Sequence, residues 1–424
     1  MLGAEQDAGR VQDPVSKRRV GCSVPGLGGT ALLRHRSSEA PFFCGTALLF
    51  VRKLGKGDKA IHSTLKVLVL GTNGQLGWQL LNKLAEAGEP RRNSTVHSAG
   101  DRASAGFGGL CLAGATRSDL DVGGADRSAI EAKLGALLDR HQPDWVINAI
   151  AYTAVDRAEN EVELAHQVNG WFPSLLGMQA RSIPVIHFSS DYVFDGKSNH
   201  AYRESDPPAP LSVYGASKLQ GEGLLLEANS KALVLRCSWV VGAHGQNFAR
   251  TILRLACERD SLRVVADQWG VPTPTDFIVE QLQQYVLVHK RWPKDSSDQN
   301  KHLGKRAFHH DRESSALALD RPLTGLYHLV PSGETNWYEY ACAILRRAKQ
   351  HPAWASRLRI DEAQVVPIST AQYPTPAPRP ANSRLDTSKW REATGQVVLT
   401  SWAEALNSTL SALLEVEPDR APAT

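Results

Sequence analysis

A tyrosine and a lysine four positions apart stand within LSVYGASKLQGE, which runs from Leu211 to Glu222. Only small residues separate Tyr214 from Lys218. At this spacing two side chains emerge on the same face of a helix. The pair is therefore either two surface neighbours or a phenol whose proton is influenced by the ammonium group beside it.

Two serines precede this pair at the end of an expected strand. The segment FSSDYVFDG carries Ser189 and Ser190. A hydroxyl at a strand end and a Tyr-x-x-x-Lys on the next helix suit carbonyl reduction, because a ketone that accepts a hydride also needs a proton. The pKa of a free phenol is about 10, and a nearby ammonium lowers it. We expect Tyr214 to donate the proton, Lys218 to assist it and bind cofactor ribose, and Ser190 to hold the substrate oxygen.

A glycine-rich turn stands much earlier in the chain. GTNGQLG places Gly71, Gly74 and Gly77 between an expected strand and an expected helix. Glycines at such a turn let the backbone approach a pyrophosphate, and the helix N-terminus offers N–H groups to it. The spacing G-x-x-G-x-x-G is one residue longer at its first step than the commonest dinucleotide fingerprint. A plain glycine-rich turn is the alternative.

The region expected after the second strand should meet the adenosine end of a dinucleotide. GATRSDLDVGGAD holds Arg117, Asp121 and Val122. An acidic residue suits a ribose hydroxyl, whereas an arginine suits a 2′-phosphate. With both present, NADPH and NADH stay open at this point. A solvated charged loop is the other interpretation.

The elements that must position these residues alternate along the chain. Short apolar runs predict strands at 64–71, 143–151, 183–190 and 231–242, and helical spacing predicts helices at 78–88, 129–141 and 169–182. This alternation predicts an α/β fold with a doubly wound parallel sheet of Rossmann type. Ligands bind such sheets at the carboxyl ends of the strands, where the motifs above fall.

The domain organisation follows from changes in composition. Residues 1–63 show no sustained period and are expected to be an extension outside the fold, and 64–245 the dinucleotide-binding domain. Residues 246–415 are expected to form mainly a smaller mixed α/β substrate domain, with some segments returning to the sheet. Two polar stretches, 89–110 and 291–322, are expected to be loop insertions.

Bulk properties exclude several classes of protein. The chain has 424 residues, 22% of them charged, and a net charge of +4, which argues against nucleic acid as a partner. Its six cysteines show no zinc spacing, so we predict no metal site and a reducing compartment. No apolar run reaches the length of a membrane span. We expect a cytoplasmic protein with no membrane partner.

The chain resembles the extended short-chain dehydrogenase/reductases, and within them the dTDP-4-dehydrorhamnose reductases, from about residue 64 onward. The motifs that carry the resemblance stand in the family's order: GTNGQLGWQL, PDWVINAIAYTAVDRAE, SSDYVFDG, PLSVYGASKLQGE, LRCSWVVGAHGQNFARTIL, VVADQWGVPT, GLYHLV and YPTPAPRPANSRLD. The resemblance implies NAD(P)H-dependent reduction of the C4 ketone of dTDP-6-deoxy-L-lyxo-4-hexulose, and it allows a homodimer.

The same resemblance implies a role for individual residues. The implied catalytic residues are Tyr214, Lys218 and Ser190. The implied cofactor-binding residues are Gly71, Gly74, Gln75, Leu76, Gly77, Asp121, Val122, Ile150, Ala151, Tyr152, Tyr214 and Lys218. The residues implied to bind the dTDP-sugar are Ser190, Asp191, Trp239 and Thr153. On physical grounds Trp239 could equally be a core residue.

Two departures from the family pattern bear on these expectations. The family usually has threonine where Ser190 stands, and the change keeps the hydroxyl. Some members carry a carboxylate at the position of Gln79, linked to a divalent cation between subunits. An amide is a weaker ligand for Mg²⁺, so Gln79 argues against a metal-bridged dimer.

Two other functions compete with the reductase. The regulatory subunit of methionine adenosyltransferase resembles the same family, and there the fold would bind a dinucleotide and a protein partner without turnover. A reductase or epimerase of another nucleotide sugar is the second alternative.

Overall fold

Seven strands form one sheet in the order β11-β6-β5-β4-β1-β3-β2. The structure is a computed structural model that describes residues 64–86, 104–106, 110–287 and 322–415. Within the sheet only β2 runs antiparallel to its neighbour. The strands are β1 Leu65–Leu70, β2 Ser104–Gly106, β3 Leu110–Ala115, β4 Trp145–Asn148, β5 Val185–Ser190, β6 Leu233–Cys237 and β11 Gly325–His328.

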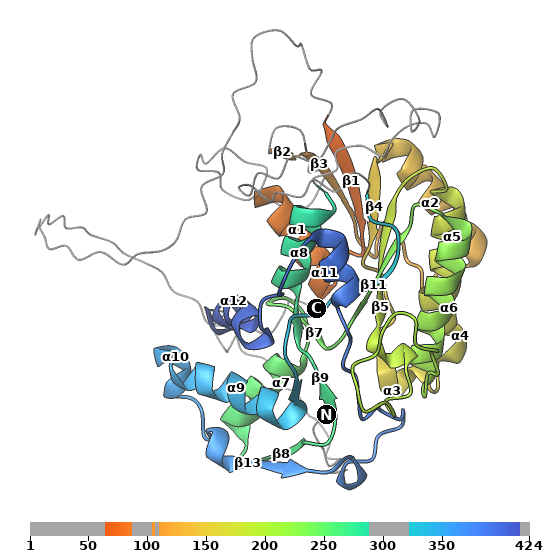
Figure 1. Cartoon of the computed structure of the whole chain (residues 1–424). Coiled ribbons are helices and arrows are strands. Elements are labelled where there is room, and N and C mark those ends of the chain that lie inside the picture. Colours follow the sequence, from red (N-terminus) through yellow and green to blue (C-terminus); the bar gives the residue numbers. More distant parts are fainter. Residues whose placement is uncertain (1–63, 87–103, 107–109, 288–321, 416–424) are drawn as a thin grey trace, which may run out of the picture. The chain divides into compact units, whose positions relative to one another are not determined.

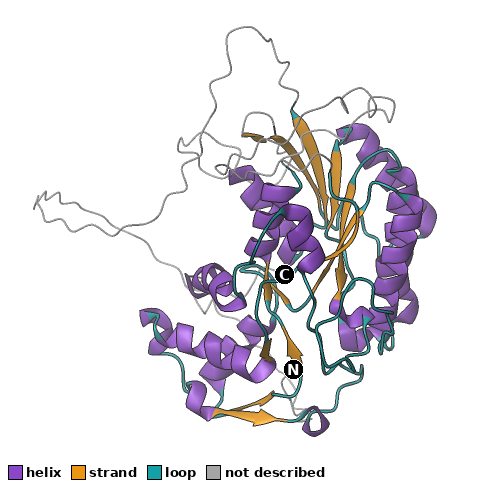
Figure 2. Ribbon diagram, in the orientation of Figure 1, coloured by secondary structure: helices purple, strands orange, loops and turns teal. Residues whose placement is uncertain are grey.

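Helices cover both faces of this sheet because its strands are apolar on both sides. In β1, Val67 and Val69 pack into one core, and Leu68 and Leu70 pack into the other. One face carries α1 Gln75–Glu86, α8 Thr275–Tyr285 and α11 Ser388–Thr394, and the other carries α2 Arg127–His141, α5 Phe172–Gln179 and α6 Val213–Ala228 (Figures 1 and 2). The doubly wound α/β fold is thereby confirmed.

A third core lies among elements that mostly follow residue 245. It joins α7 Phe248–Glu258, α9 Trp337–Lys349, α10 Pro352–Ala355 and α12 Trp402–Glu415. Short strands pair as β7 Val240–Val241 with β10 Thr273–Pro274, β9 Trp269–Gly270 with β12 Thr335–Asn336, and β8 Leu262–Val265 with β13 Val365–Ile368. The short helices α3 Val155–Ala158 and α4 Val162–His166 precede α5.

Two expectations about single elements are wrong. The strand expected over 231–242 breaks into β6 and β7, because Trp239 between them has a left-handed φ of 45°. The stretch 89–110 is not wholly a loop, since 104–106 forms β2 and β3 begins at Leu110. Most of that stretch lies outside the described residues, as do 1–63 and 291–321, so the extension and the other insertion stay predictions. The domain boundaries also stay predictions.

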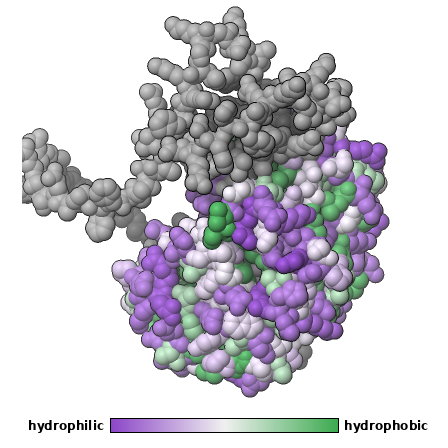
Figure 3. Space-filling view, viewed as in Figure 1, coloured by the Kyte–Doolittle hydropathy of each residue, from purple (hydrophilic) through white to green (hydrophobic). Residues whose placement is uncertain are grey.

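Within the described ranges no helix has the length and apolar character needed to cross a bilayer. On the face shown in Figure 3, hydrophilic residues predominate and hydrophobic ones form small scattered patches.

Helix α6 lies against its neighbours through glycine. A Cβ at Gly221 would stand 1.8 Å from the carbonyl oxygen of Asn169, whereas one at Gly223 would meet nothing within 4 Å. We expect Gly221→Ala to lower the free energy of unfolding by about 1–3 kcal/mol through overpacking. Gly223→Ala on the same helix should raise it by up to about 1 kcal/mol through helix propensity. Urea unfolding of both variants checks this, and equal effects would contradict it.

Candidate active site

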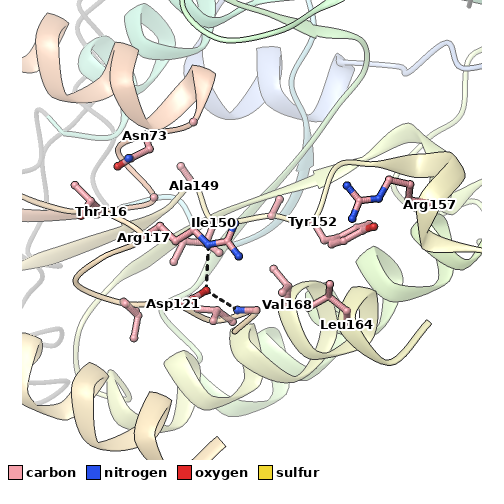
Figure 4. Close-up of a pocket in the computed structure, with 16 residues that line it drawn as sticks. Asn73, Thr116, Arg117, Asp121, Ala149, Ile150, Tyr152, Arg157, Leu164 and Val168 are labelled. Carbon is pink, nitrogen blue, oxygen red and sulfur yellow. Dashed lines mark hydrogen bonds and ion pairs between the residues drawn. The ribbon is translucent and has the colours of Figure 1, made fainter. Parts of the chain in front are cut away.

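Two adjoining cavities lie at the carboxyl ends of the parallel strands. The larger has a volume of about 640 Å³ and the smaller about 330 Å³, and they share Asn73, Gly74 and the segment 149–151. Predicted residues that line the larger cavity are Gly74, Gln75, Leu76, Ile150, Ala151, Thr153, Ser190, Asp191, Tyr214, Lys218 and Trp239. Those that line the smaller one are Gly71, Gly74, Asp121, Val122, Ile150, Ala151 and Tyr152 (Figure 4).

The glycine turn joins β1 to α1 and borders both cavities. Gly71 has a φ of +84°, and a Cβ there would stand 2.9 Å from the backbone nitrogen of Ile150. Gly77 does not line either cavity. A Cβ on Gly77 would stand 2.2 Å from the carbonyl oxygen of Gly71, so this glycine allows the helix to approach the strand. The turn and the start of α1 have the geometry that suits a pyrophosphate.

Gln75, at the first position of α1, is tied to a distant loop. Its side-chain oxygen accepts hydrogen bonds from the Gly242 N–H at 2.9 Å and the Asn247 amide at 3.1 Å, and its Nε2 donates to the Gln246 carbonyl at 3.2 Å. The side chain is thus committed to loop 242–247. The backbone N–H at the helix start is the group of Gln75 that suits a phosphate.

Tyr214, Lys218 and Ser190 converge on the larger cavity from two elements. Ser190 ends β5, and the other two side chains come from α6. The Ser212 side chain caps α6 by accepting from the Gly215 N–H at 3.2 Å. A Cβ on Gly215 would stand 2.1 Å from the Tyr192 carbonyl oxygen, so glycine brings the start of α6 close to the segment that follows Ser190.

The hydrogen bonds of this trio differ in part from the expectation. The Lys218 ammonium donates to the Phe188 carbonyl at 2.6 Å, and the Ser190 hydroxyl donates to Asp191 Oδ1 at 3.0 Å. Burial raises the pKa of Tyr214 to about 12, although hydrogen bonding with Ser190 lowers it in part. The lowered phenol pKa expected from the sequence is therefore not found, since desolvation of the phenolate outweighs the favourable contacts.

Burial also acts on the lysine. It lowers the pKa of Lys218 to about 8, and the charge of Glu222, one turn further along α6, opposes that shift. The ammonium form therefore still predominates at neutral pH. Lys218 and Tyr214 line the same cavity, but the contacts that shift the pKa of Tyr214 come from burial, Ser190 and Asp191.

Sequence reasoning missed Asn169, which lies in the π-helical turn Gln167–Trp171 before α5. Its side chain accepts from the Tyr152 N–H at 2.9 Å and donates to the Tyr152 carbonyl and the Ser217 hydroxyl, each at 3.0 Å. It thus joins the segment along both cavities to α6. The available signal in the sequence was the Asn-Gly pair inside a helical pattern. In the structure this pair lies in a π-helical turn, and such turns often mark functional sites.

An aromatic wall closes part of the larger cavity. Trp239 stacks on Trp337 with ring centroids 3.8 Å apart, and Phe248 packs against Trp337 at 4.6 Å. All three line the cavity, together with Tyr340. A tryptophan with positive φ is uncommon, and such conformations persist where surrounding contacts impose them. Sequence reasoning found Trp239 but not Trp337, Phe248 or Tyr340.

The position of Gln79 does not fit a metal ligand. Gln79 is buried, and its side-chain amide donates to the Asp276 carboxylate, which also accepts from the Thr409 hydroxyl at 3.0 Å. An amide nitrogen turned toward a carboxylate offers no lone pair to Mg²⁺. Among the described residues no cluster of three acidic, histidine or cysteine side chains could hold a metal ion.

Asp191 is a buried carboxylate that destabilises the fold when it is ionised. Burial raises its pKa from 3.8 to about 6, against the opposing effect of the Ser383 and Ser190 hydroxyls. Its Oδ2 accepts no hydrogen bond within the described part of the chain. The native state therefore holds a proton more tightly than the unfolded chain does, so stability falls as the pH rises from about 4 to 6.

We expect Asp191→Asn to raise the free energy of unfolding at pH 7.5 by roughly 1–2 kcal/mol, a gain that disappears below about pH 4. Asp195 provides the matched control, because the Tyr202 hydroxyl lowers the pKa of this nearby carboxyl. Asp195→Asn should destabilise the protein at pH 7.5. Unfolding curves between acidic and neutral pH test both signs, and destabilisation by Asp191→Asn at neutral pH would contradict the argument.

Comparison with known proteins places this arrangement in a family. The model of the RmlD substrate binding domain matches residues 65–307 and 313–415. The dTDP-4-dehydrorhamnose reductase of Burkholderia thailandensis is 34% identical over 352 residues, which cover 82% of this chain and 99% of that protein. The enzyme of the same name from Escherichia coli K12 is 33% identical, with 82% and 98% covered.

Solved structures agree with the sequence matches. The crystal structure of dTDP-4-dehydrorhamnose reductase from Bacillus anthracis in complex with NADP has a TM-score of 0.62 and 26% identity to this chain. The match covers 82% of this chain and 99% of that one. This chain belongs to the RmlD substrate binding domain family, together with the dTDP-4-dehydrorhamnose reductases that match most of its length.

Proposed function

We propose that this chain reduces the C4 ketone of dTDP-6-deoxy-L-lyxo-4-hexulose to give dTDP-L-rhamnose, with NADPH or NADH as the reductant. One observation carries the proposal: Tyr214, Lys218 and Ser190 line the same cavity as the glycine turn. The names of the curated relatives supply the substrate.

Tyr214, Lys218 and Ser190 each have a different role in carbonyl reduction. When bound, the reduced nicotinamide supplies the hydride for the carbonyl carbon. The Tyr214 hydroxyl gives its proton to the carbonyl oxygen as the C–H bond forms, and the Ser190 hydroxyl orients that oxygen. Lys218 provides a buried positive charge that stabilises the phenolate left on Tyr214. Its ammonium also suits a hydroxyl of the cofactor ribose.

The other predicted residues divide between cofactor and sugar nucleotide. Gly71, Gly74 and the start of α1 at Gln75 and Leu76 suit the phosphates, while Gly77 shapes their turn. Ile150, Ala151 and Tyr152 would lie along the cofactor, with Asp121 and Val122 near its adenosine. We assign the deoxyhexose nucleotide to four other residues of the larger cavity, Ser190, Asp191, Thr153 and Trp239.

A direct assay tests the proposal. Purified full-length chain, the 4-keto sugar nucleotide and NADPH or NADH should lose reduced-nicotinamide absorbance and form dTDP-L-rhamnose, identified by mass spectrometry and comparison with authentic product. Well-folded protein that binds NADPH but gives no product would support a binding protein without turnover. A panel of other 4-keto sugar nucleotides tests whether the chain is a reductase or epimerase of another nucleotide sugar. A faster reaction with another sugar would replace the substrate proposed here.

A further inference from the structure

Loop 242–247 joins β7 to α7 and lies along the larger cavity. Three of its residues, Gly245, Gln246 and Asn247, line that cavity together with the glycine turn and the aromatic wall. The loop therefore connects the part of the cavity that suits a phosphate with the part assigned to the sugar nucleotide. Its position depends on the groups that hold it.

Gln75 holds this loop with both atoms of its side-chain amide. The oxygen accepts from the Gly242 N–H and the Asn247 amide, and the nitrogen donates to the Gln246 carbonyl. The loop also packs closely on the side chain, because Gly245 has a φ of +76° and a Cβ there would stand 3.0 Å from Gln75 Cγ. The Gln75 side chain is thus turned to the loop, while its backbone N–H stays at the glycine turn.

Helix α1 contacts the loop a second time. Trp78, three residues after Gln75, stacks on His244 with ring centroids 5.1 Å apart and ring planes within 10° of parallel. Residues three apart lie on the same face of a helix. One face of α1 therefore supports the loop through a hydrogen-bonded contact and an aromatic contact.

Asn247 connects the loop to the aromatic wall. Its side-chain oxygen caps α7 by accepting from the Arg250 N–H at 3.0 Å, and its nitrogen donates to the Gly242 carbonyl at 2.8 Å as well as to Gln75. Phe248, the first residue of α7, packs against Trp337 of the wall. A displacement of the loop would consequently displace the start of α7 and the wall that rests on it.

We propose that the Gln75 side chain is a positioning residue for the sugar nucleotide, because it holds loop 242–247 and, through Asn247 and α7, the aromatic wall. This inference rests on the proposed function for the identity of that ligand. The family resemblance implies that Gln75 binds the cofactor. The backbone of Gln75 suits that role, and its side chain acts on the other ligand.

Gln75→Ala separates the two roles, since alanine keeps the backbone N–H and removes only the side-chain amide. Calorimetric titration of the full-length variant should show dTDP-L-rhamnose binding weakened by about 5- to 50-fold, as expected for one or two lost hydrogen bonds. NADPH binding should change by less than about 3-fold, because the helix start keeps its N–H groups. In steady-state assays KM for the 4-keto sugar should rise by a similar factor, with kcat lowered less than about 3-fold.

Two further variants test the path from Gln75 to the wall. Asn82→Ala removes another amide of α1, one that donates to the Trp78 carbonyl at 2.8 Å, and should change product affinity by less than about 2-fold. Asn247→Asp keeps an oxygen to cap α7 and loses the nitrogen that donates to Gln75. It should also weaken product binding, and the loss in the double variant with Gln75→Ala should be smaller than the product of the two single losses.

Equal losses of NADPH and product affinity in Gln75→Ala would overturn the inference, and so would unchanged product affinity or single losses that multiply in the double variant. Wild-type protein that binds no dTDP-L-rhamnose would refute the proposed function instead. Near-ultraviolet circular dichroism then still tests Gln75, because the stacked indoles of Trp239 and Trp337 give a signal that Trp239→Phe identifies. Gln75→Ala should reduce that signal, and an unchanged signal would refute the positioning role.

Product binding without ketone reduction would refute the proposed activity and leave the role of Gln75 intact.

Discussion

Tyr214→Phe is expected to lower kcat for the 4-keto sugar nucleotide by about 10²- to 10⁴-fold, the usual worth of a positioned proton donor. The variant removes one hydroxyl and keeps the ring that lines the cavity. Cofactor affinity and the unfolding midpoint should therefore stay close to those of the wild type. Steady-state kinetics with NADPH, calorimetric NADPH binding and thermal unfolding measure the three quantities.

Tyr192 supplies the matched control for this variant. Its ring packs edge-on against that of Tyr214, with centroids 5.7 Å apart, and it lines the same cavity. Tyr192→Phe removes a phenol hydroxyl from the same cavity and should lower kcat by less than about 10-fold, because no proton transfer is lost. If Tyr192→Phe were the inactive variant and Tyr214→Phe the active one, the assignment of the proton donor would be wrong.

Glu222→Gln is expected to destabilise the protein by about 3–5 kcal/mol, because it leaves a buried guanidinium without its counter-charge. The side chains of Arg236 and Glu222 are 3% and 4% exposed, and they form two hydrogen bonds to each other. His328, 3.5 Å from Arg236, cannot take over the role of Glu222. Burial, with a contribution from Arg236, lowers the pKa of His328 to about 3, so the imidazole is neutral. Urea unfolding at pH 7.5 measures the loss.

Two controls separate the ion pair from other effects of the substitution. Glu227→Gln changes an exposed carboxylate on the same helix and should shift stability by less than about 0.5 kcal/mol. The double variant Glu222→Leu with Arg236→Met removes both charges and should recover much of the loss. A single variant within about 1 kcal/mol of the wild type would show that the pair is not a buried charge pair of the expected kind.

Glu222→Gln should also alter the pH dependence of activity. Glu222 raises the pKa of Lys218 against the effect of burial. Without that carboxylate the ammonium loses its proton at lower pH. The alkaline limb of the kcat profile should therefore move to lower pH in Glu222→Gln protein that remains folded.

Local pattern predicted the parallel sheet and most of the candidate site. The apolar run of β1 ends in glycine, and Ser190 and Tyr152 stand at or beyond the ends of other strands. Because parallel strands bring their carboxyl ends to one edge, these residues reach the two adjoining cavities whatever the details of the loops. The four-residue spacing of Tyr214 and Lys218 likewise needs only a helix.

Contacts between distant segments account for what the sequence did not predict. Trp239 adopts its left-handed backbone beside Trp337 and Gly270, which follow it at long range and which no local pattern connects to it. The strand expected over 231–242 is therefore interrupted at Trp239. Asn169 belongs to the site through Tyr152 and Ser217, and the pKa of Tyr214 depends on a burial that composition does not reveal.

Helix α6 lies directly on main chain at two points. Gly215 and Gly221 place it against the carbonyl oxygens of Tyr192 and Asn169, with no intervening side chain to rotate or compress. We therefore expect the contacts between α6 and these carbonyl oxygens to change little on warming until the protein unfolds. Heat inactivation and loss of secondary structure should consequently have the same midpoint temperature. Activity should therefore be lost only at the temperature at which the protein unfolds.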